Sequence, residues 1–209
     1  MKIFFVRHGE SHANLLHEIS NRGLKHPLTS TGRQQAAALA AVLQEQNIIR
    51  IYTSPVLRAI ETAVLLADRL GVDYEVVEAL REYDVGILEG RSDQQAWNEW
   101  RAHFEAWATH QRLEQHVEGG ESFFDVRQRF VPFINQLVQE YGNSQANLGC
   151  VSHGGIYWMM LPQILGNVDL AFIQGQGGID YTTCITAELA LGGLVCTGWH
   201  GKPMDAPHS

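Results

Sequence analysis

The chain has 209 residues, of which 45% are hydrophobic and 18% charged, a balance that predicts one compact domain with a sizeable core. Its formal net charge of −8 excludes the basic footprint by which proteins bind nucleic acid or an anionic membrane. Three cysteines without paired spacing predict buried thiols in a reducing compartment. The first apolar run ends at Arg7, too early for a signal peptide, and no run is long enough to span a bilayer. We therefore expect a cytoplasmic protein whose partner is neither nucleic acid nor membrane.

Hydrophobic patterning predicts strands that alternate with helices in the first half of the chain. Short apolar runs rich in strand formers indicate the strands, and apolar residues recur at helical spacing from Ala36 to Leu43. Ser54 and Pro55 are typical of a cap followed by proline at the first helical position, and Gly71 ends that helix. The expected elements are strand 3–6, helix 33–46, strand 48–53, helix 54–70 and strand 74–77.

The second half begins with a glycine-containing loop over 78–93 and ends with a predicted hairpin that turns at Gly192 and Gly193. Residues 201–209 are expected to fray. The elements between are expected to be helices 94–110, 121–141 and 156–165 and strands 148–152, 183–191 and 194–200. We predict a single domain over 1–209 with an α/β fold, a three-layer α/β/α sandwich around a mostly parallel sheet.

Three of the predicted strands end in basic residues or histidines. Ligands of parallel α/β sheets bind beyond the carboxyl ends of the strands, so these segments are expected to share one crevice. The segments are 7–10, 54–58 and 152–154. Within them lie Arg7, His8, Arg58 and His153.

These residue types suit phosphoryl transfer, in which catalysis consists largely of positioning and of stabilising charge on the phosphoryl oxygens. A histidine ring nitrogen is a competent nucleophile, and an arginine fork meets two phosphate oxygens at once. A proton donor for the leaving oxygen is also needed. The loop after the strand at 74–77 offers four carboxyl groups: Glu78, Glu82, Asp84 and Glu89.

The chain resembles the histidine phosphatase superfamily, which includes cofactor-dependent phosphoglycerate mutases. The first matching segment reads FVRHGES over 5–11, with Asn14 beyond it. Further matching segments follow in order at 27–32 with 35–36, 52–55 with 58–59 and 62–63, 80–82 with 86 and 89–90, 120–122, and 151–155. The matches span about residues 3 to 156, and their combination is specific although Arg-His-Gly alone is not.

The resemblance implies a phosphoglycerate mutase-like fold and a role for each matching residue. His8 would be the phosphorylated nucleophile, and Glu82 the acid that protonates the leaving oxygen and then the base that activates water. A helical segment at about 91–122 would cover the active site. No metal and no cofactor are implied. The residues that would hold the phosphoryl group and bind substrate are Arg7, Arg58, His153, Asn14, Ser11 and Gly154.

Several alternatives stand beside these roles. Glu78 or Glu89 could replace Glu82 as the acid, since loop carboxylates are commonly only solvated. A zinc site at His8, His12 and His17 is disfavoured because their spacing fits no common zinc pattern.

Two further groups of residues have a structural and a functional interpretation. The aromatic stripe Trp97, Trp100, Phe104 and Trp107 is better explained by a helix packed on the domain than by a ligand platform, although part of it could shape substrate choice. A second group could contact another anionic group of the substrate, but solvated side chains are the favoured interpretation: Arg22, Lys25 and Arg91.

The favoured function is a phosphatase that hydrolyses a small phosphorylated metabolite through phosphohistidine. A phosphoglycerate mutase is the alternative within the family. It is disfavoured because the segment between Gly90 and Gly120 is short and because 81–86 departs from the mutase pattern. An inactive phosphate-binding or interaction module is the alternative of another class. A homodimer is an open alternative to a monomer.

Overall fold

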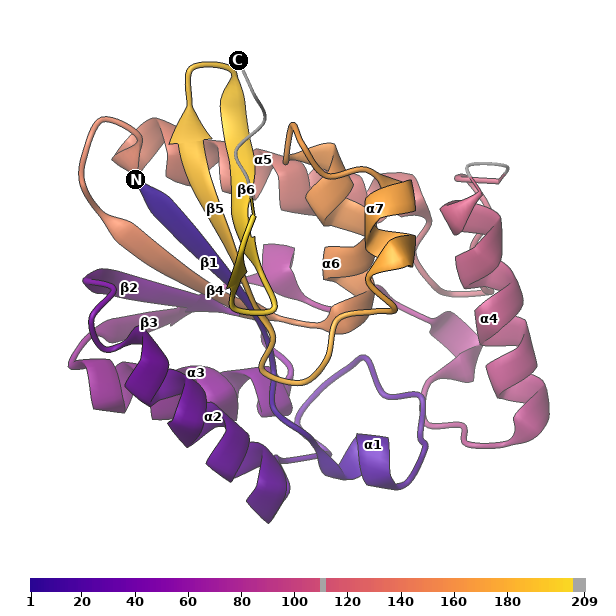
Figure 1. Cartoon of the computed structure of the whole chain (residues 1–209). Coiled ribbons are helices and arrows are strands. Elements are labelled where there is room, and N and C mark those ends of the chain that lie inside the picture. The colour runs from indigo at the N-terminus through magenta and orange to yellow at the C-terminus, as the bar shows by residue number, and fades with distance from the viewer. Residues whose placement is uncertain (110–111, 205–209) are drawn as a thin grey trace.

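The computed structural model describes residues 1–109 and 112–204, and it places one seven-stranded sheet between layers of helices (Figure 1). The strand order is β3-β2-β4-β1-β5-β6-β7. The first four strands in that order run parallel to one another. Strand β5 pairs antiparallel with β1, and β6 pairs antiparallel with β5. The predicted three-layer α/β/α architecture with a mostly parallel sheet is confirmed.

The elements follow the predicted order along the chain. The strands are β1 (Lys2–Arg7), β2 (Ile48–Thr53), β3 (Asp73–Val76), β4 (Asn147–Ser152), β5 (Cys184–Ala190), β6 (Gly193–Trp199) and β7 (Lys202–Pro203). The helices are α1 (His12–Leu15), α2 (Ser30–Leu43), α3 (Leu57–Leu70), α4 (Gln94–Ala108), α5 (Phe123–Tyr141), α6 (Gly154–Met160) and α7 (Leu170–Gly175). Short 3₁₀ turns occupy Glu78–Leu80, Gly86–Leu88 and Leu161–Gln163.

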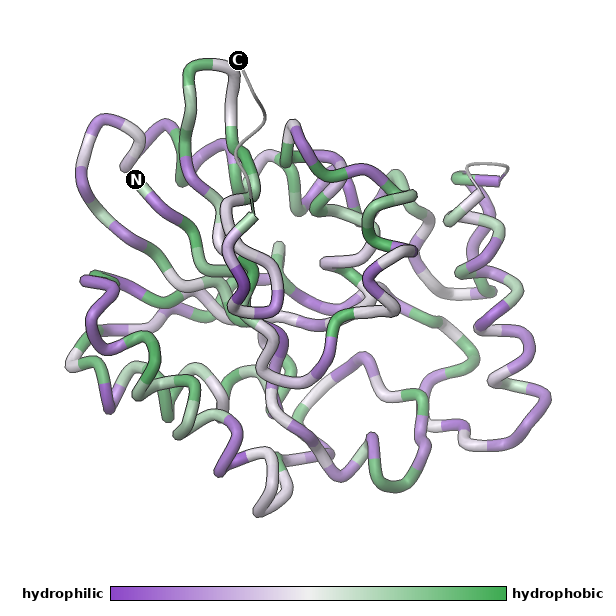
Figure 2. Tube along the Cα trace, viewed as in Figure 1, coloured by the Kyte–Doolittle hydropathy of each residue, from purple (hydrophilic) through white to green (hydrophobic). Residues whose placement is uncertain are grey.

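Alternate residues of β1 supply the two halves of the core. Phe4 and Val6 pack with α2 and α3, whereas Ile3 and Phe5 pack with α5 and α6 on the opposite face. Successive side chains of a strand point to opposite faces, so a strand covered on both sides reads as a continuous apolar run. Helices α2 and α3, which cover one face, alternate between hydrophobic and hydrophilic residues in Figure 2.

Several element boundaries differ from those predicted. Helix α3 begins at Leu57 with Val56 as its N-cap, not at a Ser54 cap; the Ser54 hydroxyl accepts from the Val56 N–H at 3.2 Å and is also bonded to a histidine ring. Helix α6 starts at Gly154 and ends at Met160, and Pro162 lies in the 3₁₀ turn that follows. A proline has no N–H to continue the helical ladder.

Short elements were missed because they have too few residues to show a period. These are α1, α7 and β7. Strand β7 pairs with β6, so residues 202–203 are not frayed as predicted. The remainder of that predicted tail, 205–209, and the predicted helix end at His110 lie outside the described residues.

Across residues 1–109 and 112–204, no helix combines the length and the apolar content that crossing a membrane requires.

Strand pairing determines where the functional side chains lie. β4 is hydrogen-bonded between β2 and β1, and its register sets Arg7 opposite Ser152 and Thr53 opposite Val151. The three carboxyl ends are therefore level with one another. The backbone continues this alignment for one more residue, because the His8 N–H donates to Ser152 O and the Ser54 N–H donates to Val151 O, both at 3.0 Å.

Candidate active site

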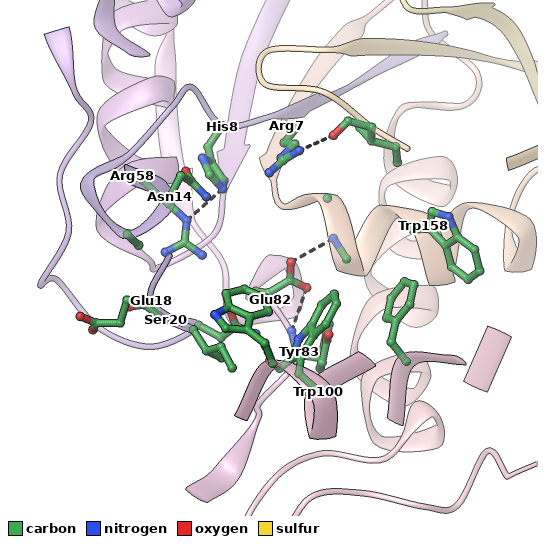
Figure 3. Close-up of a pocket in the computed structure, with 18 residues that line it drawn as sticks. Arg7, His8, Asn14, Glu18, Ser20, Arg58, Glu82, Tyr83, Trp100 and Trp158 are labelled. Atoms are coloured by element: carbon green, nitrogen blue, oxygen red, sulfur yellow. Dashed lines mark hydrogen bonds between the residues drawn. The ribbon is translucent and has the colours of Figure 1, made fainter. Parts of the chain in front are cut away.

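A pocket of about 310 Å³ opens at these three strand ends (Figure 3). Its floor carries Arg7 and His8 from the end of β1, Arg58 from the first turn of α3, and Glu82 from the loop after β3. His153, the N-cap of α6, lies directly beneath and is fully buried. Ionisable groups with shifted pKa values that converge in one pocket mark a candidate active site.

His8 presents one ring nitrogen to the pocket. Its Nδ1 lies 2.7 Å from Gly9 O, and since a carbonyl only accepts, Nδ1 carries the proton. The lone pair of the neutral ring is therefore on Nε2. Burial holds the pKa of His8 well below its ordinary value, and the charges of Arg58 and Arg7 lower it further. The ring is thus kept in the neutral form that a nucleophile requires.

Arg58 lies between the two histidines. Its Nε–H donates to His8 Nε2 at 2.9 Å, and its Nη2–H donates to His153 Nδ1 at 3.2 Å. Its Nη1 is buried and has no hydrogen-bond partner among the described residues. Burial lowers the pKa of this guanidinium, but an arginine stays charged at neutral pH. The Nη1–H of Arg58 can therefore donate to an anion beside His8.

His153 is oriented by Ser54. Because Nδ1 accepts from Arg58, the neutral ring carries its proton on Nε2, which donates to Ser54 Oγ at 2.7 Å. Burial keeps the pKa of His153 well below its ordinary value. Sequence reasoning assigned Ser54 to a helix cap and missed this contact, although Ser54 lies within the matching segment 52–55.

Arg7 is held by the segment before β5. Its Nη1–H donates to Ile179 O, and its guanidinium lies 4.4 Å over the ring of Tyr181. A cation over an aromatic face is attracted by the ring quadrupole. The Nε of Arg7 is buried without a partner among the described residues, as is Nη1 of Arg58. No sequence signal had linked Tyr181 to the site.

Glu82 is a buried carboxyl group aimed into the pocket. Its oxygens accept from the Tyr83 N–H at 3.1 Å and from the Gly155 N–H at 3.0 Å. Burial raises the pKa of Glu82, partly offset by these amides and by Arg58. Of the alternatives, Glu78 is largely exposed, and Glu89 accepts from the backbone of Asn21, so neither lines the pocket.

The loop that carries Glu82 is supported by an arginine that sequence reasoning missed. Arg129 of α5 donates from Nη1 to Ala79 O at 2.9 Å and to Arg81 O at 2.8 Å. Its other two nitrogens donate to both oxygens of Glu121, at 2.9 and 3.0 Å. A bidentate arginine of this kind restricts the geometry of the loop more than one contact could.

The predicted substrate-binding residues divide between the pocket and the layer beneath it. Asn14 lines the pocket, and its Oδ1 accepts from the Ser11 N–H at 3.0 Å and the Ser11 hydroxyl at 2.8 Å, leaving Nδ2 as a donor. Ser11 is fully buried and does not line the pocket; it donates to Asn14 Oδ1, and a role in substrate binding stays a prediction. Gly154 lines the pocket beside the Arg7 guanidinium.

Two clusters disfavoured as binding sites from the sequence have these positions in the structure. The structure does not gather His8, His12 and His17 into a group of three potential metal ligands. The three cations for which solvated side chains were the favoured interpretation lie outside the pocket and pair with carboxylates. The pairs are Arg22 with Asp84, Lys25 with Glu18, and Arg91 with Asp93.

The aromatic stripe of α4 divides between the core and the pocket. Trp107 is 3% exposed and packs in the core, as the favoured interpretation of the stripe predicted. Trp97, Trp100 and Phe104 are only half-buried, and they line the pocket. The segment predicted to cover the site therefore contributes one wall of it.

Comparison with known proteins identifies relatives of the chain. Residues 3–200 match the family described as the histidine phosphatase superfamily (branch 1). Glucosyl-3-phosphoglycerate phosphatase of Mycolicibacterium vanbaalenii is 30% identical over 170 residues, which cover 79% of this chain and 74% of that protein. The 6-phosphofructo-2-kinase/fructose-2,6-bisphosphatase of Gallus gallus is 33% identical over 165 residues, 78% of this chain but 32% of that protein, so the chain spans about a third of its length. The native structure of a mycobacterial glucosyl-3-phosphoglycerate phosphatase has a TM-score of 0.80 at 24% identity, over 96% of this chain and 99% of that one, and shares the fold.

Proposed function

We propose, from the premise that this chain belongs to the histidine phosphatase superfamily (branch 1), that it hydrolyses small phosphomonoesters through a phosphohistidine on His8. The family membership that the motifs indicated is confirmed. The chain is a phosphatase, a phosphoric monoester hydrolase, as is the relative at 30% identity by its name. The role of each site residue is our proposal.

One observation carries the proposal. Two buried arginine N–H groups, Arg7 Nε and Arg58 Nη1, have no partner among the described residues, and both belong to side chains beside the lone pair of His8 Nε2. A buried unpaired donor is costly unless something accepts from it. A phosphoryl group seated on His8 would accept from both. The Asn14 Nδ2 and the Gly154 amide would add to this cradle.

In the first step, His8 Nε2 attacks phosphorus and the Arg58 Nε–H turns from the ring nitrogen to a phosphoryl oxygen. The N–P bond forms as the ester P–O bond breaks. Glu82, whose pKa is raised by burial, gives its proton to the leaving oxygen.

In the second step, water attacks phosphorus from the face that the alcohol has left. Glu82, now a carboxylate, takes a proton from that water. The N–P bond breaks, inorganic phosphate forms, and His8 recovers its lone pair. Arg7 and Arg58 hold the equatorial oxygens throughout, where charge spreads in the transition state.

The test is phosphate release from a panel of phosphomonoesters in excess chelator, with rapid acid-free quenching to trap ³²P-labelled protein. Wild type is expected to release phosphate and to carry an acid-labile label. His8→Ala should lose both, whereas the matched control His12→Ala, at an exposed position on α1, should keep both. Substantial turnover by His8→Ala would overturn the assignment.

The same panel separates the alternatives. With 3-phosphoglycerate and its bisphosphate present, fast isomerisation with little release would identify a mutase. Phosphate binding without turnover of any ester would identify a binding module. The cytoplasmic location, the homodimer and the absence of a nucleic-acid partner stay predictions.

A further inference from the structure

The wall opposite the phosphoryl cradle is aromatic. It is formed by Trp97, Trp100 and Phe104 of α4, Trp158 of α6 and Tyr83. The Trp100 and Phe104 rings lie parallel, with centroids 5.3 Å apart and planes 7° apart, and Phe104 lies 4.7 Å from Trp158. Figure 3 shows Tyr83, Trp100 and Trp158 around the pocket, with Glu82 beside Tyr83. We name these five residues the aromatic wall.

The aromatic wall is rigid and only partly covered. The Trp97 Nε1–H donates to His17 O at 2.8 Å, which ties α4 to the loop after α1. Tyr83 is buried beneath Trp100 and Phe104, with near-parallel rings. The outer rings stay half-exposed, although the neighbouring Trp107 of the same helix is buried in the core. Apolar surface left open inside a concave site typically contacts a ligand.

The cations of the pocket are confined to the phosphoryl cradle. Of the described residues that line it, Arg7 and Arg58 are the arginines, no lysine contributes, and both lie beside His8. The outer part carries Glu18 instead, which pairs with Lys25 and His26. A second phosphate or a carboxylate on the substrate would meet this acidic side chain without a free cation to pair with.

Two polar side chains of the outer pocket are engaged with other groups, whereas the Tyr83 hydroxyl has no partner among the described residues. The Asn21 Nδ2 donates to Tyr83 O at 2.8 Å, and Glu18 Oε1 accepts from Lys25 and His26. A site that discriminates hydroxyl groups needs unpaired donors and acceptors placed for them. The open aromatic surface and the lack of a free cation among the described residues that line it therefore favour a flat, uncharged ring over a polyanionic group.

We infer that the preferred substrates are phosphomonoesters of alcohols that carry an uncharged aromatic ring, with the ring stacked on Trp100 and Phe104 while the phosphoryl group lies on His8. The inference rests on the proposed function, whose site it extends. Offset stacking adds to simple area burial, and a base-sized ring on an aromatic side chain contributes enough to raise affinity by about tenfold or more.

The test compares 2-phenylethyl phosphate with propyl phosphate and 3-phosphoglycerate. All three are alkyl phosphates, so the comparison isolates the ring and the charge. Wild type is expected to show a kcat/KM at least about tenfold higher for 2-phenylethyl phosphate than for the other two. Trp100→Leu should remove most of that ratio. The matched control Tyr74→Leu, which removes an exposed ring from β3, should keep the ratio.

Contrary outcomes are distinguishable. Hydrolysis of all three esters at similar kcat/KM, or equal losses for both uncharged esters in Trp100→Leu, would overturn this inference and leave the phosphatase proposal standing. Failure to hydrolyse any ester, including 4-nitrophenyl phosphate, would overturn the phosphatase proposal. Calorimetric binding of 2-phenylethyl and propyl phosphate to wild type then still decides the inference, because equal affinities would refute it. Phe104→Leu serves as the second variant if Trp100→Leu does not fold.

Discussion

Gly155→Ala is expected to displace the carboxyl group of Glu82, the proposed acid, although Glu82 itself is not substituted. An added Cβ at Gly155 would lie 2.7 Å from Tyr83 Cε1 and 2.9 and 3.0 Å from the two carboxylate oxygens of Glu82. Ordinary carbon contacts lie near 3.5–4.0 Å, so about 0.8 Å or more must be found by moving neighbours. Tyr83 is 4% exposed beneath Trp100 and Phe104 and cannot retreat, so the Glu82 carboxyl group and the start of α6 have to separate.

The size of the effect follows from two opposing terms. Overpacking a closed site costs about 1–3 kcal/mol, and the helical propensity gained by replacing glycine returns at most about 1 kcal/mol. We expect a loss of about 1–2 kcal/mol in the free energy of unfolding. Misplacing a catalytic group by about 1 Å costs about 10²-fold in rate, and the hydrogen bond from the Gly155 N–H to Glu82 should lengthen as well.

The assay pairs urea unfolding with turnover of ethyl phosphate and 2,4-dinitrophenyl phosphate. The first ester needs its leaving oxygen protonated and the second does not, so the loss in kcat should fall mainly on ethyl phosphate. Gly175→Ala is the matched control, because Gly175 also lies in a helix and its added Cβ meets nothing within 4 Å. If Gly155→Ala behaves like Gly175→Ala with both esters, the steric argument fails. Equal losses with both esters would move the acid role away from Glu82.

The other predictions concern pH, support of the loop and ligand binding. Because burial raises the pKa of Glu82, its acid form persists to higher pH than for a free glutamate; kcat/KM for alkyl phosphates should fall as pH rises through that pKa, and Glu82→Gln should lack this limb in a pH profile. Arg129→Met removes the hydrogen bonds to Ala79 O and Arg81 O and both bonds to Glu121, which keeps its pair with Arg81; urea unfolding should show a loss of about 2–3 kcal/mol, and unchanged stability would refute this supporting role of Arg129. Inorganic phosphate at about 100 times its Kd should stabilise wild type by about 2.7 kcal/mol in thermal unfolding, and this gain should largely vanish in Arg58→Met.

The parts of the site that could be predicted from sequence follow from strand topology. Arg7, His8 and His153 directly follow apolar runs that only buried parallel strands explain, and parallel neighbours bring their carboxyl ends together. Arg58 follows from the helix after the next strand. The positions of these residues thus depend on local patterns and one packing rule.

The parts that could not be predicted are side-chain contacts between segments far apart in the chain. The Ser54 bond to His153, the Tyr181 ring under Arg7 and the Arg129 contacts to the Glu82 loop leave no periodic trace in the sequence. Helical spacing identified the aromatic face of α4. It could not tell Trp107, in the core, from Trp100, in the pocket, because that depends on where α4 sits against α6.

The electrostatics of the site connect its stability to its chemistry. Two guanidinium groups are buried within reach of one another, and each lowers the pKa of His8. In a folded protein such charges are normally paired, yet one carboxyl group, Glu82, faces both of them, and burial raises its pKa. The site therefore carries a positive charge that its own residues do not neutralise. A dianionic phosphoryl group would neutralise this positive charge. The uncharged aromatic wall beyond it has no cation that could pair with a second anion. That division of charge, cationic at His8 and neutral to acidic outside, is the physical reason to expect one phosphate and an uncharged ring in the same substrate.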